Sequence, residues 1–153
     1  MAKQVVVVVA ATVLVAGGGF LILEWDLPIG PLVLALSVIP LVGLRLSGRS
    51  FSRAVPDLVF GGIDTGLLAI PAVAGGVTFG VAGAVAGGVI GDALTDAIAG
   101  FFEGAMAEWL RAHGFTESRE MTTASLGKMA GCLLGSGLVL TIALLLGVDL
   151  QLA

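Results

Sequence analysis

Two almost unbroken apolar runs, at residues 4–23 and 131–148, constrain this chain more than any other feature. Each is close to the roughly 20 apolar residues that carry a helix through the hydrocarbon core of a bilayer. A transmembrane β-barrel would instead need segments of about 10 residues with alternating polarity. Hydrophobic residues make up 58% of the chain and charged residues 12%, which is more apolar surface than a soluble core of 153 residues buries. The sequence therefore predicts an all-α, polytopic integral membrane protein.

The apolar segments predict five transmembrane helices in a single transmembrane domain that covers residues 1–153. The second segment contains Pro40, which should kink it, and Gly75-Gly76 reads as the turn between the third and fourth helices. The first segment is longer than a signal-peptide core and lacks a small-x-small cleavage site, so it is expected to stay in the protein. The expected helices lie at 4–23, 28–44, 57–74, 78–102 and 125–148.

Basic residues are confined to three segments, which five spans would place on one side of the membrane. All seven lie before the first helix, between the second and third, or between the fourth helix and the first residues of the fifth: Lys3, Arg45, Arg49, Arg53, Arg111, Arg119 and Lys128. The positive-inside rule makes that side cytoplasmic. We therefore expect a multi-pass protein of the cell membrane, with its N-terminus inside and its C-terminus outside.

The 24 glycines include two stripes with a spacing of four residues. Small residues at this spacing let helix backbones approach closely in a membrane, where no hydrophobic drive pushes helices together. Packing within one subunit is the favoured role, yet two stripes in so small a chain also suggest a homo-oligomer in which one stripe meets another copy. The stripes consist of Gly83, Gly87 and Gly91 in the fourth helix and Gly127, Gly131 and Gly135 in the fifth.

Three aspartates interrupt the apolar segments, and each costs several kcal/mol in a bilayer unless it finds a partner, a proton or water. Asp92 and Asp96 are four residues apart and share a helical face. A tight turn after the third helix would make Asp64 their neighbour at a similar depth. Thr65 and Thr95 add hydroxyl oxygens beside the carboxylates.

This oxygen-rich set favours hard cations such as Na⁺, Mg²⁺, Ca²⁺ or Mn²⁺, because soft-metal ligands are absent from it. Three close carboxylates cannot all stay ionised without a cation, so a metal ion or a proton must share the site. The sequence therefore predicts an inorganic cation bound by Asp64, Asp92 and Asp96, with Thr65 and Thr95 beside them. The favoured function is binding, and transport or conduction, of Na⁺, H⁺ or a hard divalent ion.

Two other functions stay open. The first is a structural or assembly subunit without transport activity, whose aspartates only hydrogen-bond to backbone.

The chain has no Walker-type phosphate loop, no Ser-His pair, no metal-spaced Cys or His, and no basic aromatic surface. We therefore expect no organic cofactor and no nucleic acid, and partners limited to the lipid bilayer, an inorganic cation and further copies of the chain.

The second alternative is an enzyme, although a non-enzymatic function is favoured. Gly61-Gly62-Ile63-Asp64 resembles the G-x-hydrophobic-D motif of archaeal prepilin and preflagellin peptidases. Gly91-Asp92 resembles half of the G-x-G-D motif of intramembrane aspartyl proteases, with Val89 in place of the first glycine. The resemblance covers only these residues, and it implies that Asp64 and Asp92 share a proton and activate water.

Overall fold

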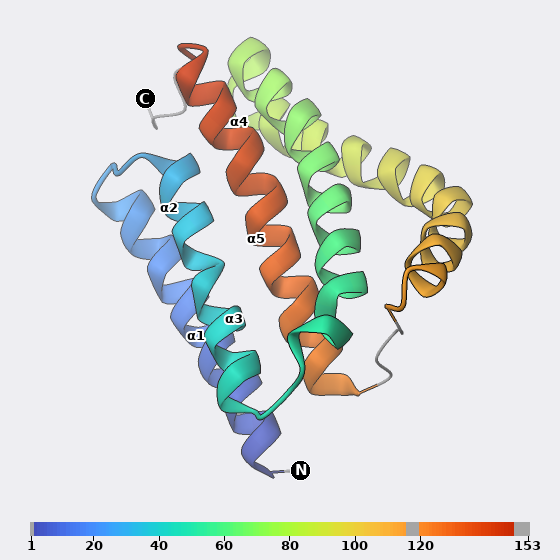
Figure 1. The fold of residues 1–153 in the computed structure, drawn as a ribbon. Coiled ribbons are helices and arrows are strands. Elements are labelled where there is room, and N and C mark those ends of the chain that lie inside the picture. The colour runs from blue at the N-terminus through green and yellow to red at the C-terminus, as the bar shows by residue number, and fades with distance from the viewer. Residues whose placement is uncertain (1, 116–119, 149–153) are drawn as a thin grey trace.

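The chain folds into a bundle of long helices, as the apolar segments predict. The computed structural model describes residues 2–115 and 120–148, and the side chains in these ranges except those of residues 99–104, 106 and 107. The expected extracellular C-terminus therefore lies outside the described residues. Every regular element in the described ranges is a helix (Figure 1): α1 (Ala2–Glu24), α2 (Ile29–Leu36), α3 (Val38–Leu46), α4 (Phe51–Ala112) and α5 (Met121–Leu145).

The second predicted span consists of two short helices, α2 and α3, which meet at Ser37. Proline lacks an N–H group, and its ring clashes with the carbonyl of the residue four positions earlier. For Pro40 that residue is Leu36, so the break falls one turn before the proline itself. The hydroxyl of Ser37 donates a hydrogen bond of 2.6 Å to the carbonyl oxygen of Leu34 and closes the end of α2.

The helix α4 is folded back on itself, and the position of the fold corrects the sequence-based prediction. The reversal lies at Gly80 (φ 65°, ψ −151°), a backbone conformation that L side chains rarely adopt. Gly75 and Gly76, the predicted turn, are helical and pack against Gly83 and Ala84 of the returning arm. Glycine has two roles in this segment: it lets the two helical arms pack closely, and it allows the chain to reverse. The sequence does not show which glycine has which role. We call residues 51–79 the first arm of α4 and residues 81–112 the second arm.

Four helical segments are long and apolar enough to cross a membrane: residues 2–24, 29–46, 51–98 and 121–145. The third of these contains both predicted spans 57–74 and 78–102, apart from the last residues of the latter. Because α4 reverses at Gly80, its two arms run in opposite directions (Figure 1). The α5 helix ends at the opposite end of the bundle from the start of α1 (Figure 1).

Large apolar side chains cover the outside of this bundle. Phe79 and Val81 are 75% and 76% exposed, whereas the buried core is small and includes Leu44, Ala54 and Leu126. A water-soluble protein rarely exposes contiguous apolar surface of this kind. Such a surface is typical of a membrane protein, in agreement with the four long apolar helical segments.

Both glycine stripes pack within the chain. Gly127, Gly131 and Gly135 lie against the first arm of α4, where the backbones of Leu58 and Gly62 come close to Gly131. The stripe Gly83, Gly87 and Gly91 joins the two arms of α4, with Gly87 against Pro71. The packing role of the six glycines is therefore observed within one subunit. Neither stripe by itself gives a reason to expect a second copy.

Candidate cation site

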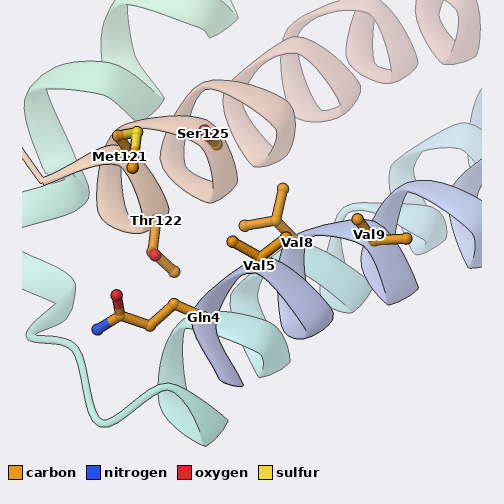
Figure 2. Close-up of a pocket in the computed structure, with 7 residues that line it drawn as sticks. All are labelled: Gln4, Val5, Val8, Val9, Met121, Thr122 and Ser125. Atoms are coloured by element: carbon orange, nitrogen blue, oxygen red, sulfur yellow. The ribbon is translucent and has the colours of Figure 1, made fainter. Parts of the chain in front are cut away.

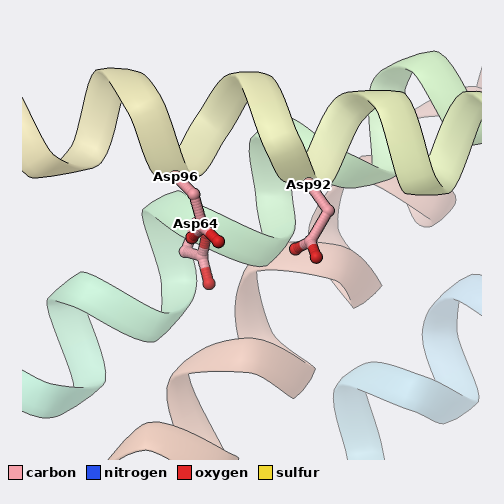
Figure 3. A group of neighbouring side chains, drawn as sticks. All are labelled: Asp64, Asp92 and Asp96. Atoms are coloured by element: carbon pink, nitrogen blue, oxygen red, sulfur yellow. The ribbon is translucent and has the colours of Figure 1, made fainter.

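The fold of α4 brings together the three aspartates of its apolar stretches. Asp64 precedes Gly80 by 16 residues and Asp96 follows it by 16, so an antiparallel pair of arms places them at the same level. At 1.5 Å per residue, that level is about 24 Å along the helices from the reversal. Asp92, one turn nearer to Gly80, shares the helical face of Asp96. Figure 3 shows the side chains of Asp92 and Asp96 turned from the second arm toward Asp64 on the first.

The carboxylates are close enough to surround one ion. One oxygen from each of Asp64, Asp92 and Asp96 lies within 4.8 Å of the other two. Three points so spaced fit in a circle of radius 4.8 Å divided by √3, about 2.8 Å, so some position lies within 2.8 Å of all three oxygens. Calcium binds oxygen ligands at about 2.3–2.6 Å, and magnesium at about 2.0–2.1 Å. Small side-chain movements suffice for either ion.

None of the three carboxylates forms a hydrogen bond or ion pair with another residue that the structure describes. Asp64 is half-buried, and its Oδ1 atom is buried without a hydrogen-bond partner in the described part of the chain. Asp92 and Asp96 are exposed at the surface of the second arm. A buried carboxylate oxygen without a partner is costly. The Oδ1 atom of Asp64 therefore lacks the hydrogen-bond donor or cation that a buried carboxylate oxygen requires.

The two threonines that the sequence predicted beside the carboxylates use their hydroxyl protons elsewhere. Thr65 donates a hydrogen bond of 2.6 Å to the carbonyl oxygen of Gly61, and Thr95 donates one of 3.0 Å to that of Asp92. The hydroxyl oxygens keep lone pairs, but these bonds hold each side chain against its own helix. The aspartates form the site, and nothing in the described contacts assigns a ligand role to Thr65 or Thr95.

Close packing of the arms holds the site at this spacing. A Cβ atom on Gly91 would lie 2.5 Å from Cγ of Pro71 and 3.4 Å from the carbonyl oxygen of Leu68. Residue 91, next to Asp92, therefore has no room for a side chain larger than that of glycine unless its neighbours move. Leu68 and Pro71 of the first arm therefore pack against the part of the second arm that carries Asp92.

The geometry also meets one requirement of the protease resemblance, since Asp64 and Asp92 contribute oxygens to the same cluster. Asp96 belongs to it equally, which a catalytic dyad does not require. No protein family, curated protein or solved structure matches this chain. The argument for function therefore depends on the site alone.

Proposed function

We propose that this membrane protein binds a metal cation through Asp64, Asp92 and Asp96 and carries it across the bilayer. The mutual approach of the three carboxylates to within 4.8 Å is the observation that supports the proposal most. Two ionised carboxylates at that separation repel by about 1 kcal/mol in water and by several times more where the dielectric constant is low. A cation between them replaces this repulsion with attraction. The oxygen-only ligand set favours Na⁺, Mg²⁺, Ca²⁺ or Mn²⁺.

The place of the cluster along the helices supports transport rather than binding alone. Asp64 follows the start of α4 at Phe51 by 13 residues, about 20 Å, and precedes the reversal by about 24 Å. Asp64 thus lies well inside the apolar segment, and Asp92 and Asp96, which are nearer to its end at residue 98, lie beside Asp64. Ionisable groups at such depth characteristically mark ion or substrate pathways. Membrane transporters commonly bind their ions near the middle of the membrane.

The first experiment is the thermal unfolding of the purified protein in detergent with increasing Na⁺, Mg²⁺, Ca²⁺ or Mn²⁺. An ion that binds only the folded state stabilises it by about 2.7 kcal/mol at a concentration 100 times the Kd. At least one of the four ions should raise the melting temperature of the wild-type protein. That rise should be absent in Asp64→Asn, Asp92→Asn and Asp96→Asn.

Asp26→Asn is the matched control, because Asp26 is exposed and lies between α1 and α2. It should respond to the ion as the wild-type protein does. In a flux assay with proteoliposomes, the wild type and Asp26→Asn should transport the ion, and the three site variants should not. If no ion distinguishes the wild type from the three site variants in either assay, the cation proposal is wrong. The structural or assembly role then becomes the better account.

A further inference from the structure

A lysine of α5 lies beside the first arm of α4, one helical turn from the carboxylate cluster. The Nζ atom of Lys128 is 5.5 Å from the centre of the Phe60 ring, which is within the range of a cation–π contact. Phe60 precedes Asp64 by four residues, so their side chains are neighbours on one helical face. The ammonium group is therefore held on the side of the first arm that carries Asp64.

The packing of α5 on the first arm fixes the level of Lys128 relative to the cluster. Its carbonyl oxygen would lie 2.7 Å from a Cβ atom on Gly61, so the two backbones touch at this point. Gly61 precedes Asp64 by three residues, about 4.5 Å along the helix. Because neighbouring Cβ atoms on a helical face are about 5–6 Å apart, the ammonium lies on the order of 10 Å from the carboxylate of Asp64.

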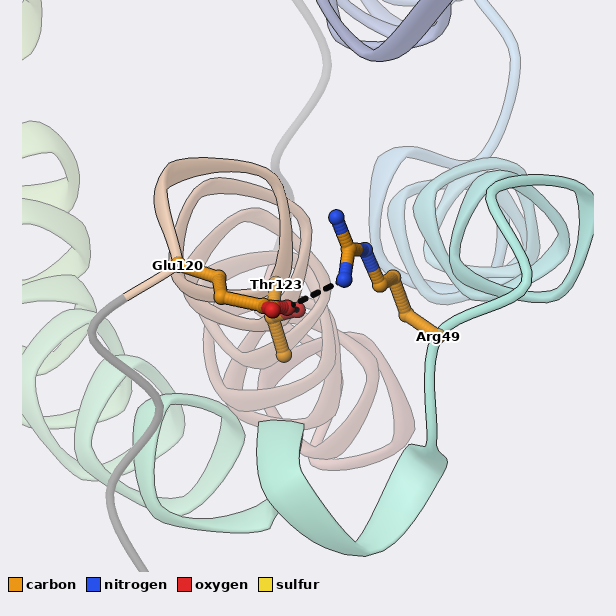
Figure 4. A network of polar contacts seen from close by, with 3 residues as sticks. All are labelled: Arg49, Glu120 and Thr123. Atoms are coloured by element: carbon orange, nitrogen blue, oxygen red, sulfur yellow. Dashed lines mark hydrogen bonds and ion pairs between the residues drawn. The ribbon is translucent and has the colours of Figure 1, made fainter. Parts of the chain in front are cut away.

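The charge of Lys128 is not neutralised by an acidic side chain within the described ranges, where it forms no ion pair or hydrogen bond. Arg49, which contacts the start of the same helix, differs in this respect. Its Nη1 atom lies 2.7 Å from Oε2 of Glu120, to which the hydroxyl of Thr123 also donates (Figure 4). A paired charge has a weak field at a distance, whereas an unpaired charge acts on ions within about 8–10 Å at physiological salt.

A positive charge at this distance opposes the binding of a second cation. The repulsion is proportional to the product of the two charges, so a divalent ion is repelled twice as strongly as Na⁺. At about 10 Å and an effective dielectric constant of about 20, the repulsion lowers the affinity for a monovalent ion roughly tenfold and for a divalent ion roughly a hundredfold. Screening by salt reduces both factors but keeps the second equal to the square of the first.

We propose that Lys128 sets the charge selectivity of the cation site, because its ammonium weakens the binding of divalent ions more than that of Na⁺. The inference rests on the proposed binding of a cation by Asp64, Asp92 and Asp96. Phe60 acts through Lys128, since its ring holds the ammonium beside the first arm, whereas long lysine side chains otherwise extend to the membrane surface. Lys128 is thus a specificity-determining residue that is not itself a ligand.

The test is isothermal titration calorimetry of the full-length protein in detergent with Na⁺, Mg²⁺, Ca²⁺ and Mn²⁺. Lys128→Met and Lys128→Gln remove the charge with an apolar and a polar side chain of similar length. Lys128→Arg keeps the charge and the ability to contact an aromatic ring.

Lys3→Met is the matched control, because Lys3 is the only other lysine of the chain. It lies at the start of α1, on the far side of α5 from the site. Gly127 packs on the first arm of α4, whereas Ser125 faces α1 together with Gln4, the neighbour of Lys3 (Figure 2). Residues two positions apart are turned by about 200° around a helix, so these two faces of α5 are opposite.

Both charge-removing variants should bind Na⁺ about three to ten times more tightly than the wild type. Their affinity for each divalent ion that binds should rise by the square of that factor, about tenfold to a hundredfold. Lys128→Arg and Lys3→Met should bind each ion as the wild type does. A change in packing alone would not produce this dependence on the charge of the ion.

Unchanged affinities in the charge-removing variants would overturn the proposal while leaving the cation site in place. An equal gain for Na⁺ and for divalent ions would overturn it as well, because the field of a charge distinguishes them. If neither the wild type nor the variants bind any of the four ions, the proposed function is wrong, and the role of Lys128 is wrong with it.

Discussion

The contact between Gly87 and Pro71 should control both the stability of the protein and the geometry of its carboxylate cluster. A Cβ atom on Gly87 would lie 2.8 Å from the carbonyl carbon of Pro71 and 3.3 Å from Cα of Ala72. Its neighbour Gly88 meets only Cβ of Ala72, at 3.9 Å, which is ordinary van der Waals contact. The two positions therefore form a matched pair on one helix, one crowded and one open.

In Gly87→Ala the second arm of α4 must move away from Pro71 by at least about 0.6 Å to restore a contact of 3.4 Å. Overpacking of this kind costs about 1–3 kcal/mol. Alanine has a higher helix propensity than glycine by about 0.5–1 kcal/mol, and both variants gain this amount. The difference between their unfolding free energies therefore reports the contact of residue 87 with Pro71. Because Asp92 lies little more than one turn beyond Gly87, the shift should also open the carboxylate cluster and weaken the ion-dependent stabilisation.

The assay is thermal unfolding of both variants in the same detergent, with and without the stabilising ion. Gly87→Ala should melt below the wild type and respond less to the ion, whereas Gly88→Ala should behave as the wild type or melt slightly above it. Equal melting of the two variants, with equal ion responses, would refute the idea that the close approach of the arms sets the site.

Further predictions concern the other helix contact, the topology and the assembly. Gly131→Ala should destabilise the chain by about 1–3 kcal/mol, because a Cβ there would lie 2.9 Å from the amide nitrogen of Gly62; Gly17→Ala, with nothing within 4 Å, is the control in a melting experiment. A cysteine at Ser50 should react with a membrane-impermeant reagent only from the cytoplasmic side, and one at Leu152 only from outside; reaction of both from one face would exclude five spans. Homo-oligomerisation is testable by single-molecule photobleaching in bilayers, where a single bleaching step per particle would show a monomer.

The sequence predicted the class and the approximate spans because both depend on the length of apolar runs. It placed the turn of α4 wrongly, at Gly75-Gly76, because the segment contains many glycines and each is able to serve as a hinge or as a packing surface. Only the tertiary contact with Gly83 and Ala84 shows that Gly75 and Gly76 are packed and that Gly80 reverses the chain. The error of a few residues did not separate the aspartates, since Asp64 and Asp96 remain equidistant from the true reversal.

The site was predictable as far as it depends on the energetic cost of charged residues in apolar segments and on the period of the helix. Charged residues in an apolar segment need an explanation, and a spacing of four fixes the shared face of Asp92 and Asp96. The roles of Thr65 and Thr95 were harder to predict, because a threonine hydroxyl in a helix either contacts a ligand or donates a hydrogen bond to a backbone carbonyl of the preceding turn. Here both hydroxyls donate to the backbone.

The measurement that tests the central claim most directly is the metal content of the purified protein after equilibrium dialysis against Na⁺, Mg²⁺, Ca²⁺ and Mn²⁺ in turn. The comparison is between the wild type and the triple variant Asp64→Asn/Asp92→Asn/Asp96→Asn, which keeps side-chain size and removes the three charges. A cation site at the junction of the α4 arms predicts one bound ion per wild-type chain, for at least one of the four metals, and none per variant chain. Equal metal content in the two proteins, with both folded, would contradict it.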